Sequence, residues 1–289
     1  MYLRIVKFLL VFMLLITGCD RHEKHELRLA ISPWIGYSPL YYAQEKGWLE
    51  NANIELVHST SLQETVHYFQ AGLIDAFAST QYEASMFTEN EIVHLIPINR
   101  SYGADVVLSN HTLESIINKK KVKTYFEIGT VNQLVFDDFI KKHNLPLARF
   151  DVFNKSQAVM KDLNPESDEA LLIVTYEPYA TALKNKGFNV LGSTKDNEML
   201  VLDSIYVRTN YFEHQHKSID QLYRLIIKAH QALEDNPKEY YEVVKGYLEN
   251  PSYEEFVQSL SGVRWLVNRS ESDINRLMQN HTVLPIKER

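Results

Sequence analysis

A regular alternation of short apolar strands and amphipathic helices begins near residue 26 and restricts the folds that are open to this chain. Residues 26–79 follow the order strand, helix, strand, helix, strand, and Gly72 closes the second helix. This order predicts a parallel sheet built with right-handed crossovers. A second run of the same kind covers residues 121–192, and helical spacing returns in residues 218–249 and 271–280. The pattern therefore predicts an α/β protein, and the chain is long enough for two lobes.

Two extended stretches are candidate connections between the lobes. They lie near residues 103–109 and 200–208, and no Gly/Ser-rich linker separates the two α/β runs. We therefore expect a discontinuous first lobe, residues 27–106 plus 206–289. The second lobe is expected to be continuous and to cover residues 107–205.

The single cysteine of the 289 residues directly follows a short apolar run near the N-terminus. Arg4 and Lys7 precede nine apolar residues, 8–16, and the small residues Thr17 and Gly18 come next. A basic start, a run too short to span a bilayer and small residues at its end are typical of an export signal. A plain signal peptide or membrane anchor with a chance cysteine remains an alternative.

The residues "ITGC" (16–19) resemble the lipobox of bacterial lipoproteins. The resemblance implies that residues 1–18 are a lipoprotein signal peptide and that Cys19 is the lipidation site. Residues 19–26 are then a polar, lipid-anchored tether. Asp20 resembles the signal that keeps lipoproteins in the inner membrane, so the expected location is periplasmic, anchored to the inner membrane.

Composition and missing motifs argue against several function classes. Without a second cysteine the domain has no disulfide, and no thiol is left for catalysis. The sequence lacks the G-x-S-x-G, G-x-x-x-x-G-K-[ST] and H-E-x-x-H motifs. His214 and His216 are too few for a closed zinc site. The net charge of −7 makes nucleic acid an unexpected partner. We expect no enzyme activity, no cofactor and no metal.

An ordered series of segments resembles the solute-binding proteins of ABC importers, in the branch for nitrate, sulfonate, taurine and thiamine precursors. The segments are "GYSPLYYAQEKGWLE" (36–50), "FQAGLIDAFASTQYEA" (69–84), "RSYGADVVLS" (100–109), "EIGTVNQLVFDDFIKKHNL" (127–145) and "VTYEPYATAL" (174–183). The resemblance implies a two-lobed periplasmic-binding-protein type II fold, each lobe a mostly parallel sheet flanked by helices. It also implies a monomer that closes on a small-molecule ligand and delivers it to an ABC permease.

The loops that follow the predicted strands indicate where a ligand would bind. In open parallel sheets ligands bind beyond the carboxyl ends of the strands. The loops 32–38, 79–82 and 128–133 lie there, and each opens a helix whose N–H groups suit an anionic or polar group. The predicted ligand-binding residues are Trp34, Tyr37, Ser79, Thr80, Gln81, Gly129, Thr130, Val131, Asn132, Tyr176 and Glu177.

Aromatic and acidic residues in these segments allow more than one interpretation. Tyr82 joins Trp34, Tyr37 and Tyr176 as a candidate aromatic wall, with core packing as the alternative for each. Glu127 and Glu177 are candidates for holding an amine or ring nitrogen. Asp105 and Asp203 are interpreted as hinge and turn residues, and Arg100 and Arg208 as hinge ion pairs or anion contacts.

The function that the sequence favours is that of a lipid-anchored periplasmic binding protein. It would capture a small organic solute, resembling a sulfonate, nitrate, taurine or a thiamine precursor, and hand it to an inner-membrane ABC transporter. The alternative is a periplasmic ligand-sensing subunit that signals to a membrane receptor. Both functions use the same closure of the lobes on a ligand.

Overall fold

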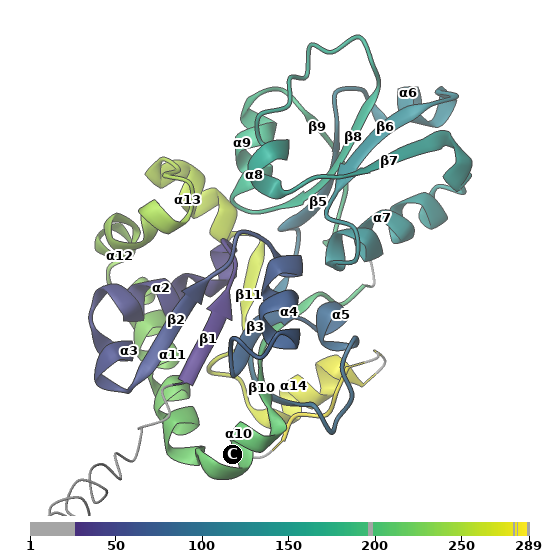
Figure 1. Cartoon of the computed structure of the whole chain (residues 1–289). Helices are drawn as coiled ribbons and strands as arrows, with labels where there is room; N and C mark the ends of the chain where they lie inside the picture. The colour runs from purple at the N-terminus through teal and green to yellow at the C-terminus, as the bar shows by residue number, and fades with distance from the viewer. Residues whose placement is uncertain (1–26, 196–198, 280, 282, 288–289) are drawn as a thin grey trace, which may run out of the picture.

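The chain forms two sheets, each flanked by helices, which lie one above the other in Figure 1. The computed structural model describes residues 27–195, 199–279, 281 and 283–287. The predicted signal peptide, the tether, Cys19 and Asp20 lie outside the described residues. Within the described part, no helix combines the length and the apolar character needed to cross a membrane.

The lower sheet in Figure 1 has six strands and the helices of the first lobe around it. In spatial order the strands are β11 (Val263–Trp265), β4 (Ile92–Ser101), β10 (Leu202–Arg208), β3 (Ala76–Thr80), β1 (Leu27–Ile31) and β2 (Ile54–His58). The helices are η1 (Ile35–Tyr37), α2 (Ser38–Glu45), α3 (Trp48–Asn51), α4 (Leu62–Gln70), α5 (Gln81–Ala84), α10 (Thr209–His214), α11 (His216–Asp235), α12 (Pro237–Val244), η3 (Lys245–Tyr247), α13 (Tyr253–Leu260) and α14 (Glu271–Met278).

The upper sheet has five strands. Their order is β7 (Phe150–Asn154), β6 (Val122–Phe126), β8 (Leu171–Tyr176), β5 (Asp105–Ser109) and β9 (Asn189–Ser193). The helices of this lobe are α6 (Leu113–Asn118), α7 (Val131–Lys142), η2 (Leu147–Arg149), α8 (Gln157–Met160) and α9 (Tyr179–Asn185). The α/β class and the two-lobed arrangement expected from the alternating pattern are therefore confirmed.

Each sheet contains a strand that follows a crossing and is antiparallel to both of its neighbours, β10 in the lower sheet and β5 in the upper sheet. β1 is parallel to β2 and β3, whereas β10 is antiparallel to β3 and β4. In the upper sheet β6 is parallel to β7 and β8, whereas β5 is antiparallel to β8 and β9. These two reversed strands are the ones that the chain enters directly after crossing between the lobes. The sheets are thus mixed, with a parallel half built by crossovers and an antiparallel half built by the crossing strands.

The two crossings lie next to each other and are joined by hydrogen bonds. The first crossing is the short link between β4 and β5, and the second lies between β9 and β10. Thr194 forms hydrogen bonds with the first crossing and its flanking strands. Its Oγ1 lies 2.7 Å from Ser101 Oγ and 2.9 Å from Gly103 N, and its N–H donates to the Asp105 carbonyl at 3.0 Å. Gly103 has φ of +101°, which favours glycine at this bend. The lobe boundaries proposed from the sequence, 106/107 and 205/206, stay a prediction.

Local sequence explains where several helices begin and end, and it explains one departure from the predicted helices. The helix expected over residues 38–50 is two helices, because Gly47 adopts a left-handed φ of +67° between α2 and α3. Helix α13 and strand β11 were not expected from the periodicity. The start of α13 nevertheless carries a capping box, since Ser252 and Glu255 satisfy each other's backbone N–H groups.

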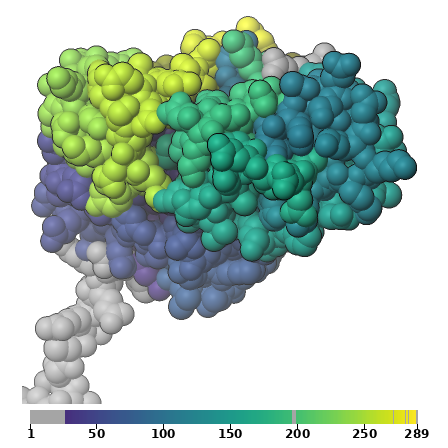
Figure 2. All heavy atoms as spheres, turned by 90° about the horizontal axis from the view of Figure 1, so that it is seen from above, coloured from purple at the N-terminus to yellow at the C-terminus, as the bar shows by residue number. Residues whose placement is uncertain are grey.

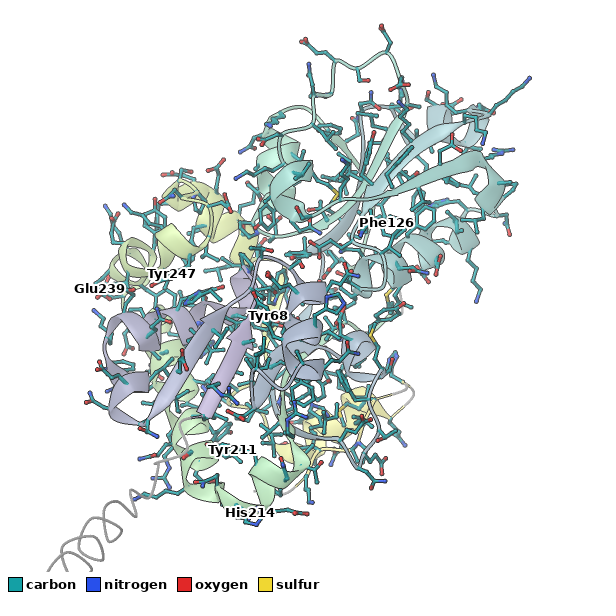
Figure 3. The ribbon with its side chains drawn as sticks, viewed as in Figure 1. Tyr68, Phe126, Tyr211, His214, Glu239 and Tyr247 are labelled. Atoms are coloured by element: carbon teal, nitrogen blue, oxygen red, sulfur yellow. The ribbon has the colours of Figure 1, made fainter. Side chains whose placement is uncertain are left out.

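Aromatic packing joins the helices of the first lobe. Tyr240 of α12 stacks on Tyr42 of α2 with ring centroids 4.5 Å apart, and its hydroxyl donates to Ser38 Oγ at 3.2 Å. Glu239 and Tyr247, both labelled in Figure 3, also contact this region, and the Tyr247 ring stacks on Tyr41 of α2 with centroids 4.6 Å apart. The Glu239 carboxylate accepts hydrogen bonds from the Tyr42 hydroxyl and the Lys46 ammonium. α12 therefore holds the helix that begins beside the candidate site.

Phe136 anchors α7 to the upper sheet and offers a test of the core. Its ring packs against Phe126, labelled in Figure 3, and against Phe150, with centroids 5.1 and 5.3 Å away. Phe136→Ala should lower the free energy of unfolding by about 3–5 kcal/mol through lost burial and the cavity left behind. Phe153→Ala is the control, because Phe153 is 42% exposed and should cost about 1 kcal/mol or less. Urea titration measures both, and equal losses would contradict the packing described here.

Candidate functional site

Residues from both lobes enclose a small cavity where their helices begin. It lies beyond the carboxyl ends of β1, β3 and β6, where the chain enters η1, α5 and α7. Its volume, about 10 Å³ for the centres of water molecules, leaves room for about one water. The lining residues are Ser32, Trp34, Tyr37, Leu62, Thr80, Asp105, Val131, Tyr176, Val201 and Asp203.

Two aromatic rings from opposite lobes face each other in this cavity. Trp34 follows β1 in the first lobe, and Tyr176 ends β8 in the second. Their ring centroids lie 5.8 Å apart at an interplanar angle of 87°, an edge-to-face contact. Tyr37 is fully buried on the wall and donates its hydroxyl to Asp203 Oδ1 at 2.8 Å. The contact between Trp34 and Tyr176 brings the lobes together at the cavity.

Several buried polar atoms at the cavity have no hydrogen-bond partner within the described part of the chain. They are Ser32 Oγ, Trp34 Nε1, Tyr176 OH and Asp203 Oδ2. The Trp34 indole lies close enough to Asp203 to lower the pKa of that carboxyl, yet no aligned hydrogen bond joins them. An unsatisfied buried polar group costs about 1–3 kcal/mol. Four such atoms around one cavity therefore indicate a site built to bond with something other than the protein itself.

Burial raises the pKa values of the carboxyl groups at the site. It raises the pKa of Asp105 to about 7, and the nearby charges of Glu83 and Glu177 act in the same direction. Burial also raises the pKa of Glu127 to about 7, with a further contribution from Glu83. The pKa of Asp203 is raised well above its ordinary value by burial and by the charges of Asp105 and Glu83. None of the ten lining residues is Lys or Arg.

Glu83 joins the two lobes beside the cavity. Its Oε1 accepts a hydrogen bond from the Val131 N–H of the other lobe at 2.7 Å. Its Oε2 accepts from Ser79 Oγ and Thr80 N, both at 3.0 Å, and from the Thr80 hydroxyl. Glu83 was not among the residues predicted from the sequence. The signal that finds it is the capping-box spacing Thr80-x-x-Glu83, which the structure shows at the start of α5.

The structure brings together some of the predicted ligand-binding residues and not others. Trp34, Tyr37, Thr80, Val131 and Tyr176 line the cavity. The remaining six do not line it: Ser79, Gln81, Gly129, Thr130, Asn132 and Glu177.

Five of these six support the loops around the cavity. Ser79 bonds to Glu83, as described above. Gln81 uses its side-chain amide to hold the Leu200 carbonyl and the Leu202 N–H, at 2.5 and 2.8 Å. Thr130 caps α7, and Gly129 precedes it with φ of +77°. Asn132 Oδ1 accepts from Gln157 at 2.8 Å, while its Nδ2 lacks a partner among the described residues.

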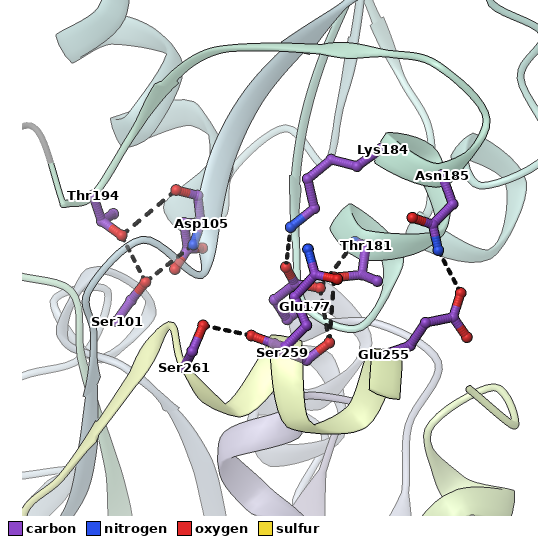
Figure 4. Close-up of polar contacts among 11 residues, drawn as sticks. Ser101, Asp105, Glu177, Thr181, Lys184, Asn185, Thr194, Glu255, Ser259 and Ser261 are labelled. Atoms are coloured by element: carbon purple, nitrogen blue, oxygen red, sulfur yellow. Dashed lines mark hydrogen bonds and ion pairs between the residues drawn. The ribbon is translucent and has the colours of Figure 1, made fainter. Parts of the chain in front are cut away.

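Glu177 belongs to a separate network between the lobes, shown in Figure 4. Its Oε2 accepts from the Thr181 N–H at 2.9 Å and from Ser259 Oγ of α13 at 3.1 Å. Its Oε1 accepts from Lys184 Nζ at 2.7 Å. With both oxygens bonded, Glu177 ties α9 of the second lobe to α13 of the first. Ser259 was not anticipated, because α13 itself was not expected.

Of the other acidic and basic residues considered in the sequence, some line the cavity and others lie outside it. Asp105 and Asp203 were interpreted as hinge and turn residues, and the structure adds that both line the cavity. Glu127 accepts a hydrogen bond from Gln157 N at 3.2 Å, and its Oε2 is buried without a described partner. Arg100 packs over Tyr102, and Arg208 packs over Phe69, so neither guanidinium lines the cavity. Among the described residues, no group of three or more His, Cys, Asp or Glu is placed to hold a metal ion.

Solved structures resemble this chain in fold. No protein-family model and no curated protein matches the sequence. The aliphatic sulphonate-binding protein SsuA from Escherichia coli gives a TM-score of 0.70 at 14% identity, covering 88% of this chain and 84% of that one. The alkanesulfonate-binding SsuA from Xanthomonas axonopodis pv. citri, bound to MOPS, gives 0.70 at 14% identity, covering 90% and 94%. The nitrate-binding NrtA from Synechocystis PCC 6803 gives 0.63 at 13% identity, covering 79% and 68%. The chain thus shares the two-lobed fold of periplasmic binding proteins for ABC import.

The raised pKa values predict how stability depends on pH. Between about pH 4 and pH 7, Asp105 and Glu127 hold protons in the folded chain that they release on unfolding, so the free energy of unfolding falls as pH rises. Glu83 and Asp203 act with the same sign, because their pKa values are also raised by burial. Asp105→Asn should therefore stabilise the protein at about pH 8, by up to about 4 kcal/mol, and change little at about pH 4.

Urea titrations at both pH values measure this difference. Asp151→Asn is the control, because Asp151 is exposed in an ion pair with Lys121 and should have little effect at either pH. A gain from Asp105→Asn that is equal at both pH values would contradict a charge effect.

Proposed function

We propose that this chain is the binding component of an ABC importer, which captures a small organic solute between its two lobes. The observation that carries the proposal is the cavity whose aromatic walls and unpartnered polar atoms come from both lobes. A site of this kind is concave and mostly apolar, with a few polar groups that fix orientation. The fold shared with sulfonate- and nitrate-binding proteins supports the same function.

Closure of the lobes is the proposed mechanism of capture. A solute that contacts Trp34 in one lobe and Tyr176 in the other binds better to the closed state, and it shifts the equilibrium by that difference in affinity. The cavity has room for about one water, so a larger solute enters when the lobes move apart at the two crossings. The closed surface would then be recognised by the permease.

Further parts of the proposal concern location and assembly. The protein acts as a periplasmic monomer without enzymatic activity or a cofactor. Cys19 attaches it to the inner membrane through lipid, with residues 19–26 as the tether. The sensory alternative keeps the same site, and gene deletion separates the two roles. Loss of solute uptake supports transport, whereas loss of a signalling response with uptake intact supports sensing.

A thermal-shift screen tests solute capture directly. The protein made from its full-length gene is screened against sulfonates, nitrate, thiamine precursors, aromatic acids and amines. A solute that binds only the folded protein at a hundredfold excess over its Kd adds about 2.7 kcal/mol of stability. Trp34→Phe should weaken the binding of a hit by about three- to tenfold, because the mutation removes an N–H that has no hydrogen-bond partner among the described residues.

Trp48→Phe is the matched control for that variant. Trp48 lies outside the cavity, under the Lys228 ammonium, which is 3.6 Å from its ring centroid. Titration calorimetry should give this control the affinity of the unmodified protein. If both variants lose affinity equally, Trp34 does not contact the solute.

The lipid anchor has its own test. Cys19→Ala should move the protein from the membrane fraction to the soluble periplasmic fraction, because the thiol is the proposed acylation site. Labelled palmitate should enter the unmodified protein and not the variant. Continued labelling of the variant would reject Cys19 as the anchor.

A further inference from the structure

The N-terminus of α7 already has an anionic partner inside the protein. Val131 is the first residue of this twelve-residue helix, and its N–H donates to Glu83 Oε1. Glu83 comes from the opposite lobe and is 0% exposed. A helix N-terminus favours an anion because its N–H groups are free and its dipole is positive there. This position, which the sequence suggested for an anionic solute, is therefore filled by a carboxylate of the chain itself.

The two oxygens of Glu83 are already hydrogen-bonded within the protein, so an anionic solute would not readily replace this carboxylate. Four hydrogen bonds reach its two oxygens, from Ser79, from Thr80 twice and from Val131. Burial raises the pKa of Glu83, whereas these four donated bonds act in the opposite direction and favour the ionised carboxylate. A competing anion would have to take the Val131 N–H from Glu83 and leave the buried Glu83 side chain beside a like charge.

The rest of the cavity wall is also unsuited to an anion. Asp105 and Asp203 both line it, and Asp203 Oδ2 has no partner among the described residues. The ten lining residues include no Lys and no Arg. An acidic solute would therefore meet two acidic side chains and no cation, so nothing at the cavity would offset the loss of its hydration, and its charge would oppose ionisation of Asp105 and Asp203.

The cavity atoms without a hydrogen-bond partner among the described residues indicate which chemical groups a solute would need. Asp203 Oδ2 accepts a hydrogen bond, the Trp34 Nε1–H donates one, and the Tyr176 hydroxyl can do either. The rings of Trp34 and Tyr176 offer apolar faces, and an aromatic face also attracts a cation. The complementary molecule has an apolar or aromatic body, a positively charged or N–H-rich end and one acceptor.

We propose that Glu83 is an internal anion that occupies the anion position of the cleft, so that the captured solute presents a cationic or N–H-rich group to Asp203 and Asp105. The solute class rests on the proposed binding function, whereas the role of Glu83 concerns the protein without solute. Glu83 is then a specificity-determining residue: it positions α7 against α5 and excludes acidic solutes of the sulfonate or carboxylate type.

The first experiment compares probes that share one apolar body and differ in charge. Benzylamine is paired with benzenesulfonate, and benzamidine with benzoate, in thermal-shift titrations of the full-length protein. The cationic members should raise the Tm, and the anionic members should leave it unchanged. Stabilisation by the anionic members would overturn the proposal and leave the binding function intact. If neither kind has an effect, the proposed solute class is rejected, and a hit elsewhere in the wider screen would still support the binding function.

The second experiment removes the internal anion. Glu83→Ala frees the Val131 N–H, so acetate and methanesulfonate should raise the Tm of this variant and not that of the unmodified protein. The matched control is Glu91→Ala. Glu91 accepts from the N–H and the hydroxyl of Thr88, both at 2.9 Å, in the same Thr-x-x-Glu spacing but at an exposed site. Acetate should not stabilise the control.

A third variant covers the case in which Glu83→Ala does not fold. Glu83→Gln keeps the size of the side chain and removes its charge, so the preference for benzylamine over benzenesulfonate should fall by at least about tenfold. An unchanged preference in Glu83→Gln would overturn the role of Glu83. Failure of acetate and methanesulfonate to stabilise a folded Glu83→Ala protein would do the same.

Discussion

The hydrogen bond from the Val131 N–H to the Glu83 carboxylate determines how the two lobes meet at the cleft. A buried carboxylate is tolerated only where donors satisfy its oxygens. Here Glu83 lies in α5, and its donors come from the end of β3 and from the start of α7. Because such bonds hold only over a narrow range of distance, these three elements keep their mutual position in the closed form. The placement of Trp34 against Tyr176 follows from the same arrangement.

Contacts away from the cavity also join the two lobes. Glu177 joins α9 to α13 through Ser259, and the Asn185 amide donates to Glu255 at 2.5 Å. Figure 2 shows the residues near 250 packed directly against the second lobe, where Lys161 also pairs with Glu249. Exposed pairs of this kind contribute about 0–1 kcal/mol each. The buried bonds of Glu83 and Glu177 therefore carry more of the closed geometry than the surface pairs do.

The sequence predicted the architecture well because periodicity and turn residues report on local structure. The alternation of strands and helices and the loops at the carboxyl ends of the strands follow from short stretches. Thr130, for example, is predicted to be a helix N-cap from the residues around it, and it caps α7. Gly47 was a local signal that should have divided the helix expected over 38–50.

The hydrogen bonds at the site are harder to predict, because they join residues that are far apart in the chain. Glu83 has the spacing of a local cap, and nothing near it indicates that its other oxygen reaches Val131, 48 positions away. Glu177 is a candidate ligand contact in the sequence, and nothing near it indicates that Ser259, 82 positions away, donates a hydrogen bond to its carboxylate. Asp203 looked like a turn residue, and only the fold places it at the cavity.

The buried carboxyls also explain why an otherwise well-packed cleft retains unfavourable interactions. Asp105, Glu127 and Asp203 would each be more stable in water, as their raised pKa values indicate. A sequence selected for stability alone would replace them with apolar or amide side chains. Local rules are commonly broken in this way where a protein binds something, because the missing partner is supplied by the ligand. A solute with a cationic or N–H-rich end would supply that partner at Asp203, and Glu83 would hold the lobes in position for it.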